Sequence, residues 1–192
     1  MIQEAFKRHI DKFAKISDEE FAEILQYFDM QHLAKKENLL SEGQTCKTHY
    51  FVVKGILRKF FISKKGVEHT TEFAIENWWM TDTLSIINQT PTEFYIEAVE
   101  RSIVLSIHTA VYSELLEKHP VMEKYFRCVY QKTSAAAQMR IKFLYEHSRE
   151  ELYHHFRRNN PEFLQRVPQF LIASYLGFTP EYLSEIRKKG TS

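Results

Sequence analysis

The side chains best suited to chemistry gather near the end of the sequence, in residues 166–189. This segment reads RVPQFLIASYLGFTPEYLSEIRKK and combines four cationic side chains with hydroxyl, amide and carboxylate groups. Arg and Lys neutralise backbone phosphates, whereas amide, hydroxyl and carboxylate groups hydrogen-bond to base edges. These residue types therefore predict contact with a nucleic acid.

The spacing within this segment predicts two short helices joined by a tight turn. Pro168 suits the first turn of one helix, and Gly177 permits the left-handed conformation that ends it. Thr179 is a good N-cap, and Pro180 fits the first position of the next helix. The residues expected to face inward are Leu171, Ile172, Ala173, Leu176, Leu183 and Ile186. This is the helix-turn-helix pattern, in which a small residue such as Ala173 lets the second helix cross closely.

The residues expected to contact DNA lie on and around the second helix. They are Arg166, Gln169, Thr179, Glu181, Tyr182, Ser184, Glu185, Arg187 and Lys188. The N-terminal residues of that helix would meet base edges in the major groove, and the basic ones would meet phosphates. An ordinary helical hairpin with charged faces is the alternative. Two carboxylates on the reading face lower the expected affinity for DNA.

The charge is distributed unevenly along the chain. Residues 1–139 carry 17 Lys and Arg against 19 Asp and Glu, whereas residues 140–192 carry 9 against 6. A basic C-terminal part fits a polyanionic partner, because cationic side chains displace condensed counterions from phosphates. A chance excess on a solvated surface is the alternative.

Upstream of this segment the pattern predicts helices, then strands, then helices again. Residues 3–15 and 18–28 repeat their apolar residues at helical spacing, and Ser17 opens a capping box with Glu20. The β-rich runs are 50–53, 56–62, 68–74, 95–99 and 103–107. Gly43, Gly55 and Gly66 punctuate them, so we expect a barrel, a sandwich or a β-roll.

A long helix is expected from Pro120 to about His147, because this stretch has no Gly and no further Pro. At 1.5 Å per residue it would extend about 42 Å. The stripe that we expect on a dimer seam comprises Phe126, Val129, Thr133, Ala136 and Met139. A helix of this length overruns a small β-domain, which favours the seam over packing on its own domain.

The segment VPQFLIASYLGFTPEYLSEIRKK resembles the helix-turn-helix of the Crp/Fnr regulators, in a short branch without an extended C-terminal wing. YFVVKGILRKFF followed by Gly66 resembles their β-roll strands, and PVMEKYFR and SREELYHHF resemble their dimer helix and the helix beyond it. The resemblance implies an α+β fold. Residues 1–119 would be an N-terminal β-roll (double-stranded β-helix) sensor domain, residues 120–147 a dimerisation helix and residues 148–192 a helix-turn-helix domain.

Membership of this family would imply a transcriptional regulator that binds double-stranded DNA as a homodimer and reads a near-palindromic operator. A small-molecule effector and RNA polymerase are the further partners that such a regulator admits. The runner-up is a ligand-sensing or protein-interaction module whose DNA-binding helix has decayed, motivated by Glu93 and Glu185.

The sequence departs from the cyclic-nucleotide-binding members of that family in WWMTDTLSIINQTPTEFYIEA. Asp82 lies near the position of their ribose-binding Glu without a preceding Gly, and Pro91 is not followed by an Arg for the phosphate. We therefore expect no control by cyclic AMP. The residues that could line a pocket for another effector are Trp79, Asp82, Ser85, Thr92, Glu93 and Tyr95. For the aromatic ones, a place in the core is the preferred explanation.

The sequence gives little support for an enzyme, a metal site or a membrane protein. Cys46 and Cys128 form no CxxC pair, and the nine His residues show no HxH or HExxH spacing. No nucleophile motif or Gly-rich phosphate loop occurs, so we expect a non-enzyme with no cofactor. The N-terminus lacks the features of a signal peptide, and no run approaches about 18 apolar residues. These features predict a cytoplasmic protein with no membrane partner.

Overall fold

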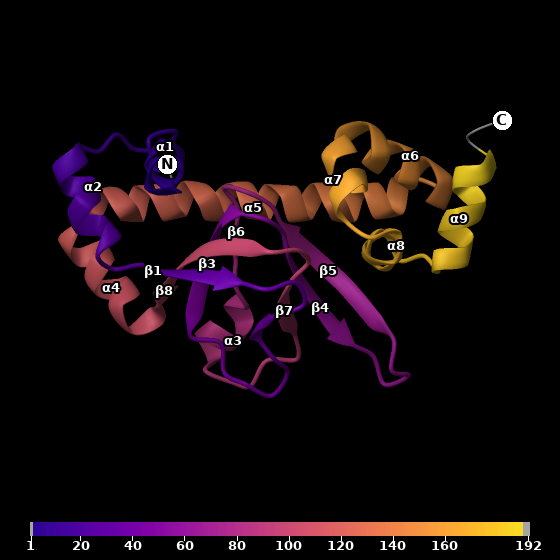
Figure 1. Ribbon diagram of the computed structural model, residues 1–192, viewed down its shortest axis with the longest axis horizontal. Helices are drawn as coiled ribbons and strands as arrows, with labels where there is room; N and C mark the ends of the chain where they lie inside the picture. The colour runs from indigo at the N-terminus through magenta and orange to yellow at the C-terminus, as the bar shows by residue number, and fades with distance from the viewer. Residues whose placement is uncertain (1, 190–192) are drawn as a thin grey trace. The chain divides into compact units, whose positions relative to one another are not determined.

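The computed structural model describes residues 2–189, and the side chains of residues 4–188. The chain divides into two compact units. The first unit joins the chain up to Phe61 with Glu72–Tyr130, and the second joins Ile62–Thr71 with the chain from Gln131 onward. Figure 1 shows the elements of both.

The first unit begins with two amphipathic helices that cover part of a β-roll. They are α1 (Ile2–Ile10) and α2 (Asp18–Leu25). The Ser17 hydroxyl accepts a hydrogen bond from the Glu20 N–H at 3.1 Å, so the predicted N-cap of α2 is confirmed. Both helices turn apolar residues into one core, including the fully buried Phe6, Ile10 and Ile24.

The roll consists of two four-stranded sheets. One sheet has the order β1 (Asp29–Leu33), β8 (Ser102–His108), β3 (Thr48–Lys54) and β6 (Trp79–Met80). The other has the order β2 (Asn38–Leu40), β7 (Tyr95–Ala98), β4 (Leu57–Ile62) and β5 (Glu68–Ala74). Neighbours in the sheets come from distant parts of the sequence; Tyr50 of β3, for example, pairs with Ser106 of β8. The five predicted β-rich runs correspond to β3, β4, β5, β7 and β8.

Three further helices belong to this part of the chain: one lies between β6 and β7, and two follow β8. They are α3 (Thr83–Asn88), α4 (Thr109–Lys118) and α5 (Pro120–Glu146). The helix α5 has 27 residues and begins at Pro120, as the sequence predicts. Its residues Met122, Tyr125 and Phe126 are buried in the core of the first unit.

Aromatic side chains dominate the core that joins α1 and α2 to the roll and to α5. The ring of Phe6 lies 4.8 Å from Phe51 and 5.0 Å from Phe28, measured between centroids. Tyr125 is fully buried among them. Its hydroxyl accepts a hydrogen bond from the indole N–H of Trp79 at 2.8 Å and lies 2.8 Å from Nδ1 of His9. Burial raises the pKa of the Tyr125 hydroxyl, so it keeps its proton and can donate it to His9.

His49 of β3 makes stability dependent on pH. Burial lowers the pKa of this imidazole from an ordinary 6.5 to about 4. Below about pH 6.5 the unfolded chain binds a proton that the folded chain does not bind, so acidification destabilises the fold by up to about 1.4 kcal/mol per pH unit. We expect this loss to level off near pH 4, where folded His49 also becomes protonated.

The substitution His49→Phe isolates this contribution, because it keeps a ring against Tyr112, whose centroid lies 4.9 Å away. Urea unfolding at pH 7.5 and pH 5 measures it. The wild type should lose about 2 kcal/mol more than the variant over this interval. Parallel losses in the two proteins would contradict the assignment.

The second unit is a cluster of helices held to the tip of the β4–β5 hairpin. Beyond the end of α5 it contains α6 (Arg149–Asn159), α7 (Pro161–Arg166), α8 (Gln169–Leu176) and α9 (Pro180–Lys189). The capping box at the start of α6 is complete: Ser148 Oγ accepts from the Glu151 N–H, and the Glu151 carboxylate accepts from the Ser148 N–H. At the hairpin tip Gly66 adopts a positive φ of 75°, as predicted for the turn.

Hydrogen bonds fix the hairpin tip to α8. Ser174 Oγ accepts from the Thr70 N–H at 2.8 Å and donates to the Glu68 carbonyl at 2.9 Å. The Arg140 guanidinium of α5 donates to the carbonyls of Thr71 and Tyr175. Residues 68–71 therefore belong to the packing of the C-terminal helices although they are distant in sequence.

Candidate nucleic-acid interface and effector region

A left-handed turn at Gly177 joins α8 to α9. Gly177 has φ 75° and ψ 28°, and its N–H donates to the carbonyls of Ala173 and Ser174. The next N–H, of Phe178, donates to the Ala173 carbonyl at 2.8 Å. Thr179 Oγ1 then accepts from the Tyr182 N–H at 3.2 Å, and α9 begins at Pro180. The predicted C-cap, N-cap and first residue are all confirmed.

The inner faces of the two helices are buried as the spacing predicts. Leu171, Ile172, Ala173 and Leu176 of α8 are buried, together with Leu183 and Ile186 of α9. Ala173 is fully buried where α8 and α9 pack. A small buried residue at this position agrees with the helix-turn-helix pattern, in which the two helices cross closely.

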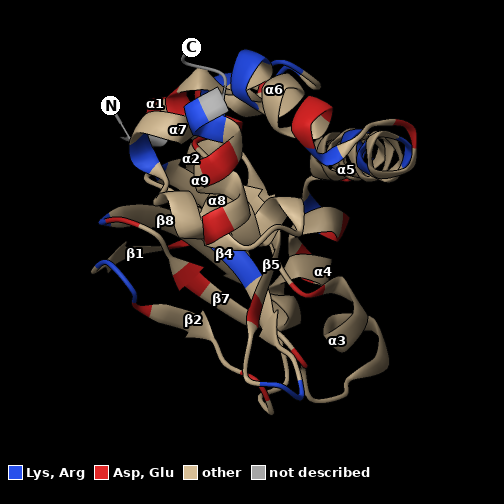
Figure 2. Cartoon of the chain, turned by 90° about the vertical axis from the view of Figure 1, so that its right-hand side faces the viewer, with Lys and Arg blue, Asp and Glu red and all other residues tan. Residues whose placement is uncertain are grey.

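The opposite face of α9 is open to solvent. The exposed side chains at its start and along it are Thr179, Glu181, Ser184, Glu185, Arg187 and Lys188, all predicted to contact DNA. Ser184, Arg187 and Lys188 also line a cavity beside α9. Tyr182 is half-buried, with its ring edge-to-face with Phe178 at 5.6 Å. Figure 2 shows acidic segments along α9 and a basic segment toward its C-terminal end. Charge on α9 thus changes from negative to positive along the helix.

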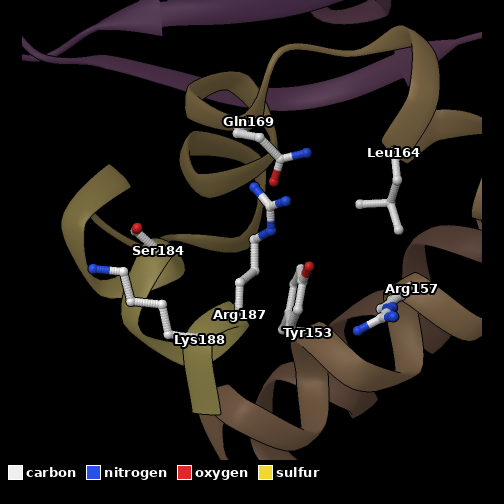
Figure 3. Close-up of a pocket in the computed structure, with 7 residues that line it drawn as sticks. All are labelled: Tyr153, Arg157, Leu164, Gln169, Ser184, Arg187 and Lys188. Carbon is white, nitrogen blue, oxygen red and sulfur yellow. The ribbon is translucent and has the colours of Figure 1, made fainter. Parts of the chain in front are cut away.

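The other two predicted contacts, Arg166 and Gln169, are half-buried at the end of α7 and the start of α8. Gln169 shares a cavity with Ser184, Arg187 and Lys188, whereas Arg166 does not line it. Tyr153 and Arg157 of α6 and Leu164 of α7 complete its lining (Figure 3). We did not predict these three; the only sequence signal was the i, i+4 spacing of Tyr153 and Arg157, which places them on one face of a helix.

Substituting Gly177 should loosen the turn between α8 and α9. A Cβ at this position would meet no atom within 4 Å, so the cost of Gly177→Ala comes from the positive φ alone. We expect the free energy of unfolding to fall by about 1–2 kcal/mol.

Gly66→Ala is the matched control, because Gly66 has the same φ and the same open surroundings. Urea denaturation should show similar losses for the two variants, whereas only Gly177→Ala should also weaken DNA binding. An unchanged free energy of unfolding for Gly177→Ala would contradict the cost that we assign to its positive φ.

The polar residues of the predicted effector region hydrogen-bond to one another. Asp82 is buried and is the N-cap of α3, where Oδ1 accepts from the N–H groups of Leu84 and Ser85. Its other oxygen accepts from the Thr92 hydroxyl at 2.5 Å. Ser85 Oγ donates to the Thr90 carbonyl and accepts from the Cys46 N–H. These groups stabilise the fold of 82–92, and Glu93 beside them is exposed.

Cationic and aromatic side chains of the roll also make contacts within the fold. Arg58 is buried, pairs with Glu97 at 2.8 Å and lies over the Phe60 ring. Tyr95 stacks on Phe60 and donates to the Glu42 carboxylate. Trp79 packs against the aromatic core and donates a hydrogen bond to the Tyr125 hydroxyl. This residue therefore has the core position that the sequence left open as an alternative to an effector pocket. Residues 91–93 are Pro, Thr and Glu, so this segment itself carries no guanidinium.

Neither a metal site nor a membrane span appears in the described part of the chain. Residues 2–189 contain no group of three or more His, Cys, Asp or Glu side chains that could hold a metal ion. Within the same range, no helix is both long enough and apolar enough to cross a bilayer.

Comparison with known proteins identifies the roll. Residues 30–119 match the family model described as "Cyclic nucleotide-binding domain". This segment is therefore similar to cyclic nucleotide-binding domains. A search of curated proteins found no match to the chain.

Solved structures of Crp/Fnr-type regulators share the fold of the cyclic nucleotide-binding domain and the C-terminal helices. The Catabolite Activator Protein of Thermus thermophilus is 17% identical, with a TM-score of 0.58 over 94% of this chain and 85% of that one. FixK2 of Bradyrhizobium japonicum is 16% identical, with a TM-score of 0.67 over 84% and 83%. The c-di-GMP-responsive global regulator CLP of Xanthomonas campestris is 14% identical, with a TM-score of 0.73 over 91% and 92%. The predicted α+β fold, with an N-terminal β-roll and C-terminal helices, is confirmed.

Proposed function

We propose that the protein is a DNA-binding transcriptional regulator of the Crp/Fnr type, which acts as a homodimer and reads a near-palindromic operator. The observation that carries this proposal is the geometry of α8 and α9. A left-handed Gly177 and a buried Ala173 set the two helices against each other, and α9 keeps one face open. A helix presented in this way can enter the major groove.

The residues of α9 divide by position into base-reading and phosphate-binding groups. Glu181, Tyr182 and Ser184 lie in its first half, where a recognition helix meets base edges. Glu181 can accept a hydrogen bond from a cytosine amino group. Arg187 and Lys188 follow in the second half, and with Arg166 they are proposed to bind phosphates without regard to sequence. Glu185 repels phosphates, which predicts modest affinity.

The exposed part of α5 supports the proposed dimer seam. From residue 131 to 146 the helix is mostly exposed, and it carries Met139, Ile141, Leu144 and Tyr145 as exposed large apolar side chains. Thr133 and Ala136 are exposed, and residues 134–137 are all small, so a second helix could approach closely here. Contiguous exposed apolar residues mark interaction sites.

The first two residues of the predicted seam belong to the core of their own chain. Phe126 is buried, and Val129 packs against the same aromatic cluster. The seam that we propose is therefore limited to Thr133, Ala136 and Met139. In functional terms, residues 1–119 would be the sensor domain and residues 120–147 the dimerisation helix. Residues 148–192 would be the domain that binds DNA.

Fluorescence anisotropy with labelled genomic fragments from upstream of genes tests the DNA-binding proposal, and sedimentation velocity tests the dimer. We expect salt-dependent binding by a dimer, and no change in affinity when cyclic AMP is added. Met139→Glu should shift the sedimentation toward a monomer, whereas Lys142→Glu serves as the control for a charge change on the same helix. Absence of binding to every fragment would favour an interaction module without DNA-binding activity.

A further inference from the structure

A polar cavity opens between α6, α7, α8 and α9, with a volume of about 380 Å³. Six polar side chains line it: Tyr153 and Arg157 of α6, Gln169 of α8, and Ser184, Arg187 and Lys188 of α9. In Figure 3 the Arg187 guanidinium points toward the Gln169 amide with Tyr153 beside it, Arg157 lies beyond Tyr153, and the Lys188 ammonium points away from the other side chains. Leu164 of α7 supplies an apolar wall. The volume lies at the lower end of the range for small-molecule sites, roughly 300–1,000 Å³.

The charge of the lining selects an anion. Arg157, Arg187 and Lys188 bring three cations to the cavity, and no carboxylate side chain lines it. The hydroxyls of Tyr153 and Ser184 add neutral donors. Guanidinium groups bind phosphate through two parallel hydrogen bonds, and lysine adds a compact charge. This donor set fits a phosphate group better than an uncharged ligand.

Gln169 adds a requirement that a phosphodiester of DNA cannot meet, because that group has no proton to donate. Its side-chain oxygen Oε1 is buried and has no hydrogen-bond partner among the described residues. A buried acceptor without a partner is costly, so a ligand that donates a hydrogen bond to it would be favoured. Backbone phosphates of DNA and their deoxyriboses carry no hydroxyl donor within the strand. A sugar phosphate or a ribonucleotide carries both the phosphate oxygens and free hydroxyls.

We propose that this cavity binds a small phosphorylated metabolite with free hydroxyl groups, of the sugar phosphate or ribonucleotide class. Its phosphate would bind Arg187 and Arg157, Lys188 would add positive charge nearby, and a hydroxyl would donate to Gln169. If the proposed function also holds, the ligand competes with DNA, because Ser184, Arg187 and Lys188 belong to both sites. A ligand that binds only the DNA-free form lowers the apparent affinity for DNA.

Isothermal titration calorimetry on the full chain tests the site with glucose 6-phosphate and AMP, using glucose, adenosine and inorganic phosphate as comparison probes. We expect saturable binding of the two phosphorylated compounds, weaker binding of inorganic phosphate and none of the uncharged compounds. Arg157→Gln should weaken the binding about tenfold or more, because it removes a charge-assisted hydrogen bond. Arg158→Gln is the matched control, since it removes the same charge from an exposed neighbour on α6 that does not line the cavity.

Three further outcomes separate the proposed site from its alternatives. Equal binding by Arg157→Gln and Arg158→Gln would show attraction to surface charge rather than a site. No binding of any phosphorylated probe, together with a larger loss of duplex affinity in Arg157→Gln than in Arg158→Gln, would assign the cavity to a DNA phosphate. Saturable binding that persists while no duplex binds at all would support the site and reject the proposed function separately.

Discussion

Replacing Tyr125 with alanine is expected to lower the free energy of unfolding of the first unit by about 3–5 kcal/mol. The side chain is fully buried, and its ring lies 5.0 Å from Phe126 and 6.3 Å from Phe6 between centroids. The substitution leaves a cavity among rigid aromatic rings that cannot collapse to fill it. Urea denaturation followed by tryptophan fluorescence measures the change, since Trp79 lies in the same cluster.

Tyr125→Phe separates the hydrogen bonds from the packing. It keeps the ring and removes the hydroxyl that Trp79 and His9 share, so both partners lose a buried hydrogen bond. We expect the free energy of unfolding to fall by about 1–3 kcal/mol, to a value between those of the wild type and of Tyr125→Ala. A stability equal to that of the wild type would show that these hydrogen bonds contribute nothing.

The double substitution Arg187→Ala and Lys188→Ala should reduce DNA affinity about tenfold to a hundredfold at moderate salt, on every duplex alike. Both side chains are exposed in the second half of α9, where they are proposed to neutralise phosphates. Each lost phosphate contact should also reduce the slope of log affinity against log salt concentration by about 0.9. Anisotropy titrations at four or five salt concentrations give both quantities.

Tyr182→Ala is the control for this prediction. Tyr182 lies in the first half of α9 and carries no charge, so its loss should change the preferred sequence and leave the salt slope unchanged. A double variant whose slope equals that of the wild type would exclude Arg187 and Lys188 from the phosphate contacts.

The C-terminal helices could be predicted in detail because their signals are local. Gly177, Thr179 and Pro180 each have a conformational preference that acts within a few residues, and the apolar spacing of α8 and α9 defines their buried faces. The hairpin turn at Gly66 was predictable for the same reason. Such elements need no knowledge of the remainder of the chain.

The missed elements depend on distant partners. The strand β1 is mostly exposed, β2 has three residues, and β6 has only two, which pair with Tyr50 and Phe51 of β3. The helix α7 has six residues between two prolines, too few for a periodic signal. Phe126 fits a dimer stripe by spacing, and only the packing of Trp79 and Tyr112 against its ring shows that it lies in a core.

The sequence predicted the cavity residues on α8 and α9, and it missed those on α6. Gln169, Ser184, Arg187 and Lys188 came from the two-helix pattern, whereas Tyr153 and Arg157 reach the same cavity because α6 packs beside these helices. Interhelical packing of this kind leaves no mark in the spacing of a single segment. The hydrogen bond between His9 and Tyr125, 116 residues apart, is another example.

Selection of bound DNA from a random-sequence pool tests the central claim most directly, because it reports recognition and symmetry together. We expect the full chain to enrich a near-palindromic sequence with half-sites about one helical turn apart, roughly 10 base pairs between centres. Tyr182→Ala should enrich a different half-site. A pool that stays random after repeated rounds at low salt would contradict DNA reading by α9.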